Sequence, residues 1–285
     1  MSYQQYRPSS FQILPPVIKN LLIINAIMLF AQFVLRNTYH MELSELLGLH
    51  FFFASGFRPW QLITYMFMHG DIWHLLSNMF ALWMFGSTLE NYWGAKRFLT
   101  FYLITGLGAA FTHYVVVYFQ VHPMLEAINA YLNNPDLKTF EAFVQPDHLK
   151  IISNAMLSQM NEFAAHYNSL EAQGDKAGML RASVEFMQNY KADYLNSIPP
   201  IVGASGSIFG VLLAFGMLFP NTLLYLYFAI PVKAKYFVIA YGALELYSGL
   251  SNNPADNVAH FAHLGGMLFG FILIKYWGHN RTNFY

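Results

Sequence analysis

The sequence has no cysteine and few charged residues. The absence of cysteine among 285 residues excludes disulfide frameworks, thiolate metal sites and cysteine nucleophiles. Charged residues make up 11% of the chain, whereas a soluble domain of this size carries about 25%. The net charge of zero and the pI of about 7.2 give no reason to expect a nucleic acid partner. Because 56% of the residues are hydrophobic, the shortage of charge indicates that lipid surrounds most of the chain.

Six stretches are apolar enough to be candidates for crossing a bilayer, which takes about 20 residues. They cover residues 17–35, 72–92, 96–119, 202–219, 235–250 and 257–277. The fifth stretch is short and carries Glu245, so its ends are the least defined. The segment NTLLYLYFAIP, residues 221–231, is expected to lie along the membrane interface. The polar start of the chain, MSYQQYRPSSFQILPP, is not typical of a cleaved signal peptide. The sequence therefore predicts an all-α membrane protein with six spans and both termini on one side.

Lysine and arginine indicate the orientation of the spans. Eight basic residues fall on the side that holds both termini: Arg7, Lys19, Lys96, Arg97, Lys233, Lys235, Lys275 and Arg281. The opposite side has Arg36 and Arg58 in the first loop, together with a long polar insert. Cytoplasmic loops carry the excess of positive charge, so both termini are expected to be cytoplasmic. We expect a multi-pass protein of a bacterial cell membrane, since no transit-like leader is visible.

The composition changes between residues 120 and 200. This segment holds nine acidic and five basic residues, a net charge of −4. Apolar residues recur there at helical spacing, namely Ile151, Ile152, Met156, Leu157 and Met160. Helix-breaking residues separate the helical runs, namely Pro123, Pro135, Pro146 and Gly174. We expect residues 120–200 to form an extracytoplasmic helical insert. Residues 1–119 contain the first three spans and residues 201–285 the last three, and these six spans are expected to form one domain. A tolerated loop insertion and a role in substrate access or partner binding are equally open.

A run of small and hydroxyl-bearing residues, VGASGSIFG, opens the fourth span at residues 202–210. Small residues let a neighbouring helix approach closely, which by itself would explain the run. The sixth span, however, carries AHFAHLGGMLFG, in which His263, Gly266 and Gly270 share one helix face. A glycine ridge docked on the fourth span would bring the His263 imidazole to the Ser205 hydroxyl at matching depth. A serine needs such a base to act as a nucleophile.

Other roles for the histidines stay open. His260 lies one turn before His263 on nearly the same side and is the rival base, although only His263 directly precedes the glycine ridge. A zinc site of His74, His260 and His263 is conceivable, but no carboxylate or HExxH pattern accompanies these residues. Asp256, in the loop before His260, is not expected to complete a triad. The sequence favours a Ser–His dyad whose imidazole is positioned by packing, with no metal and no cofactor.

Attack on a peptide carbonyl creates an oxyanion, and the second span offers donors for it. In HLLSN, His74 and Asn78 stand four residues apart on one helix face. The backbone N–H of Ser205, at the start of a helix, is a third donor. The alternative is an ordinary interhelical hydrogen bond between His74 or Asn78 and a neighbour, worth about 0.6 kcal/mol.

Three segments together resemble the rhomboid family of intramembrane serine proteases. They are RPWQLITYMFMHGDIWHLLSNMFALWMFGSTLE, GASG and AHFAHLGGMLFG, in the order of that family and in the expected spans. Each segment is weakly specific alone, and the resemblance does not extend to the insert. It implies a six-helix rhomboid-like bundle; the placement of the insert on the outer face is expected from the charge distribution alone.

The resemblance also implies the residues of the site. Ser205 would be the nucleophile and His263 the general base. His74 and Asn78 would stabilise the oxyanion together with the Ser205 amide. Gly203 matches the first glycine of the family's GxSG motif and belongs to the same group.

Further residues match supporting positions of the family. His69 matches a structural or oxyanion-supporting histidine, and Glu90 matches a structural acid that closes the second span. Arg58 and Trp60 fall in a membrane-associated loop that serves as a scaffold. Phe209 stands where a tyrosine often stacks on the catalytic imidazole, so an aromatic ring is retained there.

We therefore predict an intramembrane serine endopeptidase that cleaves single-span membrane proteins near the outer membrane boundary. The substrate helix must unwind locally, since helical backbone groups are already paired. Two other functions stay open. One is non-catalytic binding of membrane clients, although rhomboid relatives of that kind usually lack the serine or the histidine. The other is transport through a histidine-lined core, for which no inverted repeat is visible. The expected partners are substrate helices and the bilayer, with the insert as a further contact surface.

Overall fold

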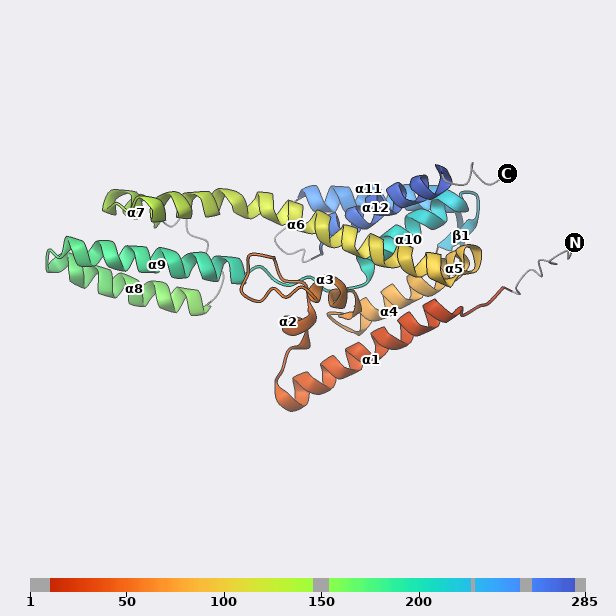
Figure 1. The fold of residues 1–285 in the computed structure, drawn as a ribbon, viewed down its shortest axis with the longest axis horizontal. Coiled ribbons are helices and arrows are strands. Elements are labelled where there is room, and N and C mark those ends of the chain that lie inside the picture. Colours follow the sequence, from red (N-terminus) through yellow and green to blue (C-terminus); the bar gives the residue numbers. More distant parts are fainter. Residues whose placement is uncertain (1–10, 146–153, 227–228, 252–257, 280–285) are drawn as a thin grey trace, which may run out of the picture. The chain divides into compact units, whose positions relative to one another are not determined.

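The structure is a computed structural model that describes residues 11–145, 154–226, 229–251 and 258–279. It forms two compact units (Figure 1). The first comprises residues 1–49, 59–113 and 201–285, and the second comprises residues 50–58 and 114–200. The second unit therefore contains the predicted insert but begins earlier and takes in part of the first loop. Residues with predicted roles that lie outside the described ranges are Arg7, Pro146, Ile151, Ile152, Asp256 and Arg281.

The first unit is a bundle of helices. Its helices, in chain order, are α1 (Pro16–Tyr39), α2 (Leu43–Leu47), α3 (Gln61–Thr64), the 3-10 turn η1 (Tyr65–Phe67), α4 (Ile72–Ala81), the π-helical turn η2 (Leu82–Gly86), α5 (Ser87–Trp93), the first part of α6 (Ala95–Asn133), α10 (Ser205–Leu218), α11 (Ala234–Ser251) and α12 (His260–His279). The predicted second span corresponds to α4, η2 and α5, which follow one another without a break. The N-terminus of α1 is capped from α5, because the Glu90 carboxylate accepts hydrogen bonds from the N–H groups of Val17 and Ile18 at 2.9 and 2.8 Å.

Glycine sets the distance between α10 and α12. A Cβ at Gly266 would overlap the carbonyl oxygen of Gly206, and a Cβ at Gly270 would lie 3.3 Å from the Cα of Gly210. The two backbones therefore touch directly along this face, as in small-residue contacts between membrane helices. α11 packs against both α10 and α12 and closes the bundle on the side of the α12 histidines.

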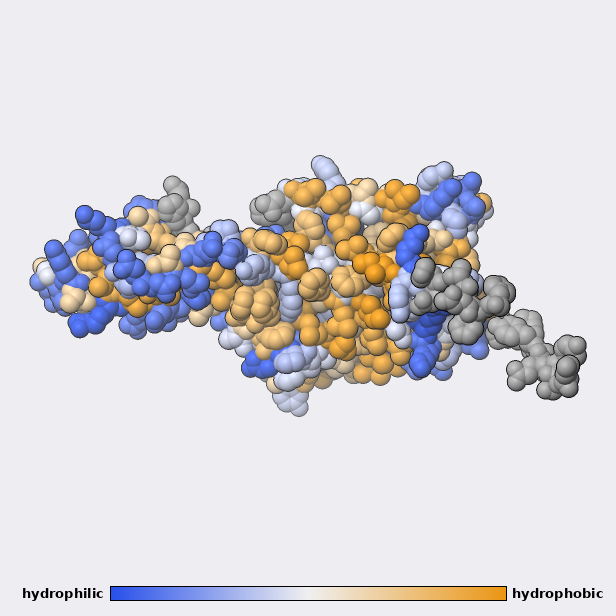
Figure 2. All heavy atoms as spheres, turned by 45° about the horizontal axis from the view of Figure 1, so that its top comes forward, coloured by the Kyte–Doolittle hydropathy of each residue, from blue (hydrophilic) through white to orange (hydrophobic). Residues whose placement is uncertain are grey.

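The surface of the first unit is strongly apolar. Large side chains such as Phe30, Phe33, Ile239, Tyr247 and Ile272 are exposed, and Figure 2 shows hydrophobic residues gathered over the bundle. Apolar patches on water-soluble monomers rarely exceed a few hundred Å². Within the described ranges, α1, α6 and residues 260–278 of α12 have the length and hydropathy to cross a membrane, and α10 is a shorter apolar helix. The protein is a multi-pass, all-α membrane bundle; the count of six spans stays a prediction.

The second unit contains the rest of α6 with α7 (Leu137–Phe143), α8 (Asn154–Ala172) and α9 (Lys176–Asn196). Asp136 and Asp175 cap α7 and α9, accepting from the N–H groups of Thr139 and Gly178 at 3.0 and 2.8 Å. A core of its own holds the helices together: Ile128, Tyr131, Phe140, Met156, Tyr167, Met179, Met187 and Tyr190. The helical character expected for residues 120–200 is thus present in the part described.

One local prediction was wrong. Pro123 was expected to break a helix, but it lies inside α6, which runs on to Asn133. Val121 and Leu125, on either side of it, are buried in an apolar cluster, so tertiary packing maintains the helix despite the missing N–H. The segment 221–231 was expected to lie along the membrane interface, and this placement stays a prediction. The structure adds that β1 (Leu223–Leu226) and β2 (Ile230–Lys233) form an antiparallel pair in this part of the chain. The ladder pairs backbone polar groups of Leu223–Leu226 with those of Ile230–Lys233.

Candidate active site

Ser205 is the first residue of α10, and its hydroxyl lies against α12. The distance from Ser205 Oγ to His263 Nε2 is 2.8 Å, a hydrogen bond between two residues 58 positions apart. Gly203, two residues earlier, has φ +122°, a backbone conformation that side-chain-bearing residues rarely adopt. The glycine therefore allows the turn that aims the start of α10 at the imidazole.

The His263 imidazole is held on two sides. Its ring stacks on Phe209, with centroids 4.2 Å apart and planes 5° from parallel. Its other nitrogen, Nδ1, lies 2.8 Å from Glu245 Oε2 on α11. The aromatic ring expected at Phe209 is present in contact with the imidazole. The prediction that packing alone positions this imidazole was wrong, because a carboxylate also binds it.

His260, the rival base, binds the same carboxylate. Its Nδ1 lies 2.7 Å from Glu245 Oε2, and its ring is 6.4 Å from that of His263. The histidine whose Nε2 meets Ser205 is His263. In the part of the chain that the structure describes, the group with metal-ligand spacing is Glu245, His260 and His263, so the zinc set that included His74 is not formed.

The sequence did contain a signal for Glu245. Ionisable side chains within spans are costly and mark function by default, and Glu245 is an acid in the predicted fifth span. The sequence of the fifth span shows no residue three or four positions from Glu245 that would pair with its charge. The histidines that it meets stand 15 and 18 residues away on α12, so only the packing of α11 on α12 reveals the contact.

The predicted oxyanion residues lie on the other side of Ser205. A Cβ at Gly203 would be 2.8 Å from His74 Nε2 and 3.6 Å from Ser205 Oγ, so a side chain at this position would crowd the His74 ring. The N–H of Gly203 itself donates to the carbonyl oxygen of Tyr65 at 2.9 Å. Gly203 therefore has no free N–H to donate to an oxyanion, and its contribution is the absence of a side chain beside His74. Asn78 is buried, and its Nδ2 has no hydrogen-bond partner among the described residues.

His69 and Asp71 set the position of His74. The buried His69 ring packs edge-on against the His74 ring at 5.0 Å. Burial lowers the pKa of His69 to about 4, so this imidazole is neutral at pH 7. Asp71 caps α4 and accepts from the His74 N–H at 2.9 Å, a bond that lowers the pKa of the Asp71 carboxyl.

Ser207, the second hydroxyl of the VGASGSIFG run, has a different environment. It is buried, and its Oγ donates to the carbonyl oxygen of Tyr102 at 2.8 Å. A serine that bonds a helix carbonyl in this way fits between packed helices without an exposed reactive oxygen. The two serines of the run are thus distinguished by their partners, an imidazole and a backbone carbonyl.

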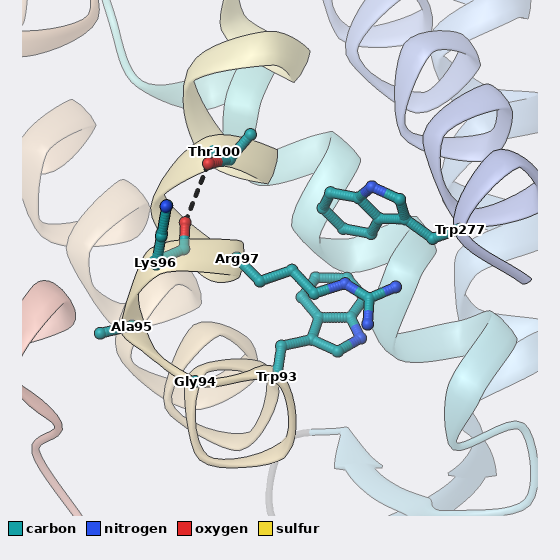
Figure 3. Close-up of a pocket in the computed structure, with 7 residues that line it drawn as sticks. All are labelled: Trp93, Gly94, Ala95, Lys96, Arg97, Thr100 and Trp277. Atoms are coloured by element: carbon teal, nitrogen blue, oxygen red, sulfur yellow. Dashed lines mark hydrogen bonds between the residues drawn. The ribbon is translucent and has the colours of Figure 1, made fainter. Parts of the chain in front are cut away.

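A cavity of about 660 Å³ lies elsewhere in the first unit, at the junction of α5 and α6. Its lining includes Lys96, Thr100 and the indoles of Trp93 and Trp277, and none of the predicted site residues takes part. Arg97 lies over the two indoles, 4.2 Å from the Trp277 ring and 5.8 Å from the Trp93 ring (Figure 3). Aromatic and basic side chains of this kind are typical of a membrane–water interface.

The fold and the candidate site define the class of protein, a multi-pass membrane bundle in which a serine hydroxyl contacts a histidine. Comparison with known proteins gives the family of the chain. The model of the Rhomboid domain family matches residues 56–122 and 176–280. The chain belongs to the rhomboid family. The match omits residues 123–175, which lie within the predicted insert, and also the first predicted span.

Similar curated proteins come from eukaryotes and bacteria. An uncharacterized mitochondrial rhomboid protein of Schizosaccharomyces pombe is 26% identical over 216 residues, which is 75% of this chain and 49% of that protein. The mitochondrial RHOMBOID-like protein 12 of Arabidopsis thaliana is 28% identical over 75% of this chain and 45% of its own length. Rhomboid protease GluP of Bacillus subtilis is 35% identical over 71 residues, 25% of this chain and 13% of that protein. The chain spans about half the length of the first two relatives.

Proposed function

We propose that this rhomboid family member is an intramembrane serine endopeptidase that cleaves single-span membrane proteins near the outer membrane boundary. The contact of 2.8 Å between Ser205 Oγ and His263 Nε2 carries the proposal. A hydroxyl is a weak nucleophile until a base at hydrogen-bond distance takes its proton. The name of one similar protein, Rhomboid protease GluP, gives the same reaction class.

In the proposed reaction, Ser205 Oγ attacks the scissile carbonyl carbon while His263 Nε2 takes the hydroxyl proton. The carbonyl π electrons move to oxygen, and the new oxyanion needs donors already in place. Collapse of the tetrahedral intermediate breaks the C–N bond as His263 returns the proton to the leaving amine. Water then hydrolyses the acyl-enzyme by the same two steps, with His263 as base and then as acid.

The residues around Gly203 fit the oxyanion role. The position of its missing side chain is bordered by His74 Nε2 and by Ser205. Ser205 opens α10, and the first N–H groups of a helix have no intrahelical acceptor, so its amide is a candidate donor. Buried donors are normally paired, so the unpaired Asn78 amide is explained if a substrate oxygen is its partner.

Asn78→Ala is expected to lower kcat by about 10²–10³-fold and to change KM little, since the donor would act only on the oxyanion. Steady-state cleavage of a fluorescent single-span substrate measures both constants. The matched control is Asn37→Ala, because Asn37 is exposed on α1 and donates to the carbonyl of Phe33. A raised KM at unchanged kcat would assign Asn78 to substrate binding instead.

The boundary at which cleavage occurs follows from the charge distribution. The basic residues of the loops and tails favour cytoplasmic termini, which puts the start of the fourth and sixth spans, and with them Ser205 and His263, at the extracytoplasmic side. The residues between the third and fourth spans then lie on the same side, where substrates or partners can contact them. Substrates with helix-breaking or small residues near that boundary are favoured, because their backbone becomes available for attack.

The proposal is tested with purified protein in detergent, a single-span substrate and a fluorophosphonate probe. Two substrate fragments are expected, cut near the extracytoplasmic boundary, and mass spectrometry should find the probe on Ser205. Chelation with EDTA should leave both results unchanged. A substrate that co-purifies with the protein while neither fragments nor labelled Ser205 appear would contradict the protease and favour client binding.

A further inference from the structure

Glu245 is a carboxylate on an otherwise apolar helix, turned toward the site. The sequence of α11 has one further charged residue, Lys235, at its start. The side chain of Glu245 is 13% exposed, and those of His260 and His263 are 12% and 10% exposed. A charge removed from water in this way is costly unless it is paired and hydrogen-bonded. Here one oxygen, Oε2, lies 2.7 Å from His260 Nδ1 and 2.8 Å from His263 Nδ1.

The contact determines which nitrogen of His263 carries the proton. Nε2 faces Ser205 Oγ and has to be unprotonated to accept the hydroxyl proton, so the proton of the neutral ring must be on Nδ1. An Nδ1–H group donates to Glu245 Oε2, whereas the opposite tautomer would place two lone pairs against each other at 2.8 Å. The carboxylate therefore favours the tautomer that makes His263 a base toward Ser205.

His260 supports the same arrangement. It precedes His263 by three residues on α12, so both imidazoles lie on the face toward α11. With its Nδ1–H donating to the oxygen that also accepts from His263, the carboxylate is fixed by two donors. His260 thus holds Glu245 in place instead of competing with His263 for Ser205.

A bridging metal ion is the other arrangement that these three groups allow, and the distances match direct hydrogen bonds better. Zinc bonds of about 2.0–2.1 Å in a tetrahedral site separate neighbouring ligand atoms by about 3.3 Å. The observed separations from Oε2, 2.7 and 2.8 Å, are those of direct N–H···O hydrogen bonds to a carboxylate.

We propose that Glu245 is a positioning residue that orients His263 and completes a Ser205–His263–Glu245 triad, with His260 as the second donor to the carboxylate. This inference rests on the proposed protease function. Glu245 stays ionised throughout: the Ser205 proton moves to His263 Nε2 and then to the leaving amine, and the carboxylate stabilises the imidazolium that exists between these transfers.

The test compares Glu245→Gln and Glu245→Asp with the wild type in cleavage kinetics and thermal unfolding. Glu245→Gln should lower kcat by about 10²-fold with little change in KM, while the Phe209 stack still holds the ring. Glu245→Asp keeps the charge and should recover about tenfold of that loss. Glu90→Gln is the structural control, because Glu90 caps α1 and should lower the melting temperature without a comparable change in kcat.

The outcomes separate this inference from the proposed function. A wild type that neither cleaves nor labels at Ser205 overturns the protease and the triad together. An active wild type matched in kcat by Glu245→Gln overturns the triad alone. A wild type that EDTA inactivates and Zn²⁺ restores overturns the triad and the metal-independent serine mechanism together, because His263 would then be a metal ligand. A loss in Glu245→Gln that only follows the unfolded fraction also overturns it, because that is the effect of a structural residue.

Discussion

Ser205→Ala is expected to lower kcat by about 10⁶-fold, below detection in most assays, because the variant has no atom to attack the carbonyl. His263→Ala should lose a similar amount, since Ser205 would keep its proton. The double variant should lose no more than either single variant, because the two residues act as one unit in the same step. Single-turnover cleavage of a fluorescent single-span substrate in detergent measures all three rates.

Ser207→Ala is the matched control for this comparison. It removes a hydroxyl from the same helix, but that hydroxyl bonds the Tyr102 carbonyl instead of an imidazole, and its loss costs about 1 kcal/mol of stability. Its kcat should stay within about tenfold of the wild type. Cleavage by Ser205→Ala at the wild-type rate would rule out the serine mechanism, and losses that add in the double variant would show that the two residues act independently.

Gly266→Ala is expected to damage both the fold and the site. Its methyl group would occupy the position of the Gly206 carbonyl oxygen, so α12 has to move away from α10. Overpacking of this kind costs up to about 3 kcal/mol, and here the obstacle is backbone, which adjusts less than a side chain. A shift of about 1 Å between His263 and Ser205 would lower kcat about 10²-fold.

Gly278→Ala provides the comparison on the same helix. A Cβ there meets nothing within 4 Å, so the melting temperature and kcat should match the wild type or improve slightly through helix propensity. Thermal unfolding and kcat per folded molecule, measured on both variants, separate lost stability from lost alignment. A Gly266→Ala variant that equals Gly278→Ala in both measurements would disprove the contact between α10 and α12.

Much of the helical framework was predictable because its signals are local. The predicted spans at residues 17–35 and 235–250 match α1 and α11 to within a few residues, since long apolar runs of this composition form helices in lipid. The spacing of Gly266 and Gly270 in α12 correctly predicted the face of this helix that contacts α10. The prediction that Pro123 ends a helix was wrong because the helix-breaking effect of proline is strongest in an isolated helix, whereas buried neighbours stabilise α6 around Pro123.

Sequence by itself determined that the protein is a helical membrane protein and that a serine, a histidine and glycine ridges stand where two spans can meet. Composition and helical period are properties of single segments, so they can be read before any packing is known. Only the tertiary structure decided which helix faces which, and hence that Glu245 on α11 meets His260 and His263 while Ser207 meets a backbone carbonyl. The period of a helix tells which residues share a face, but the partner of that face depends on how all the helices pack together.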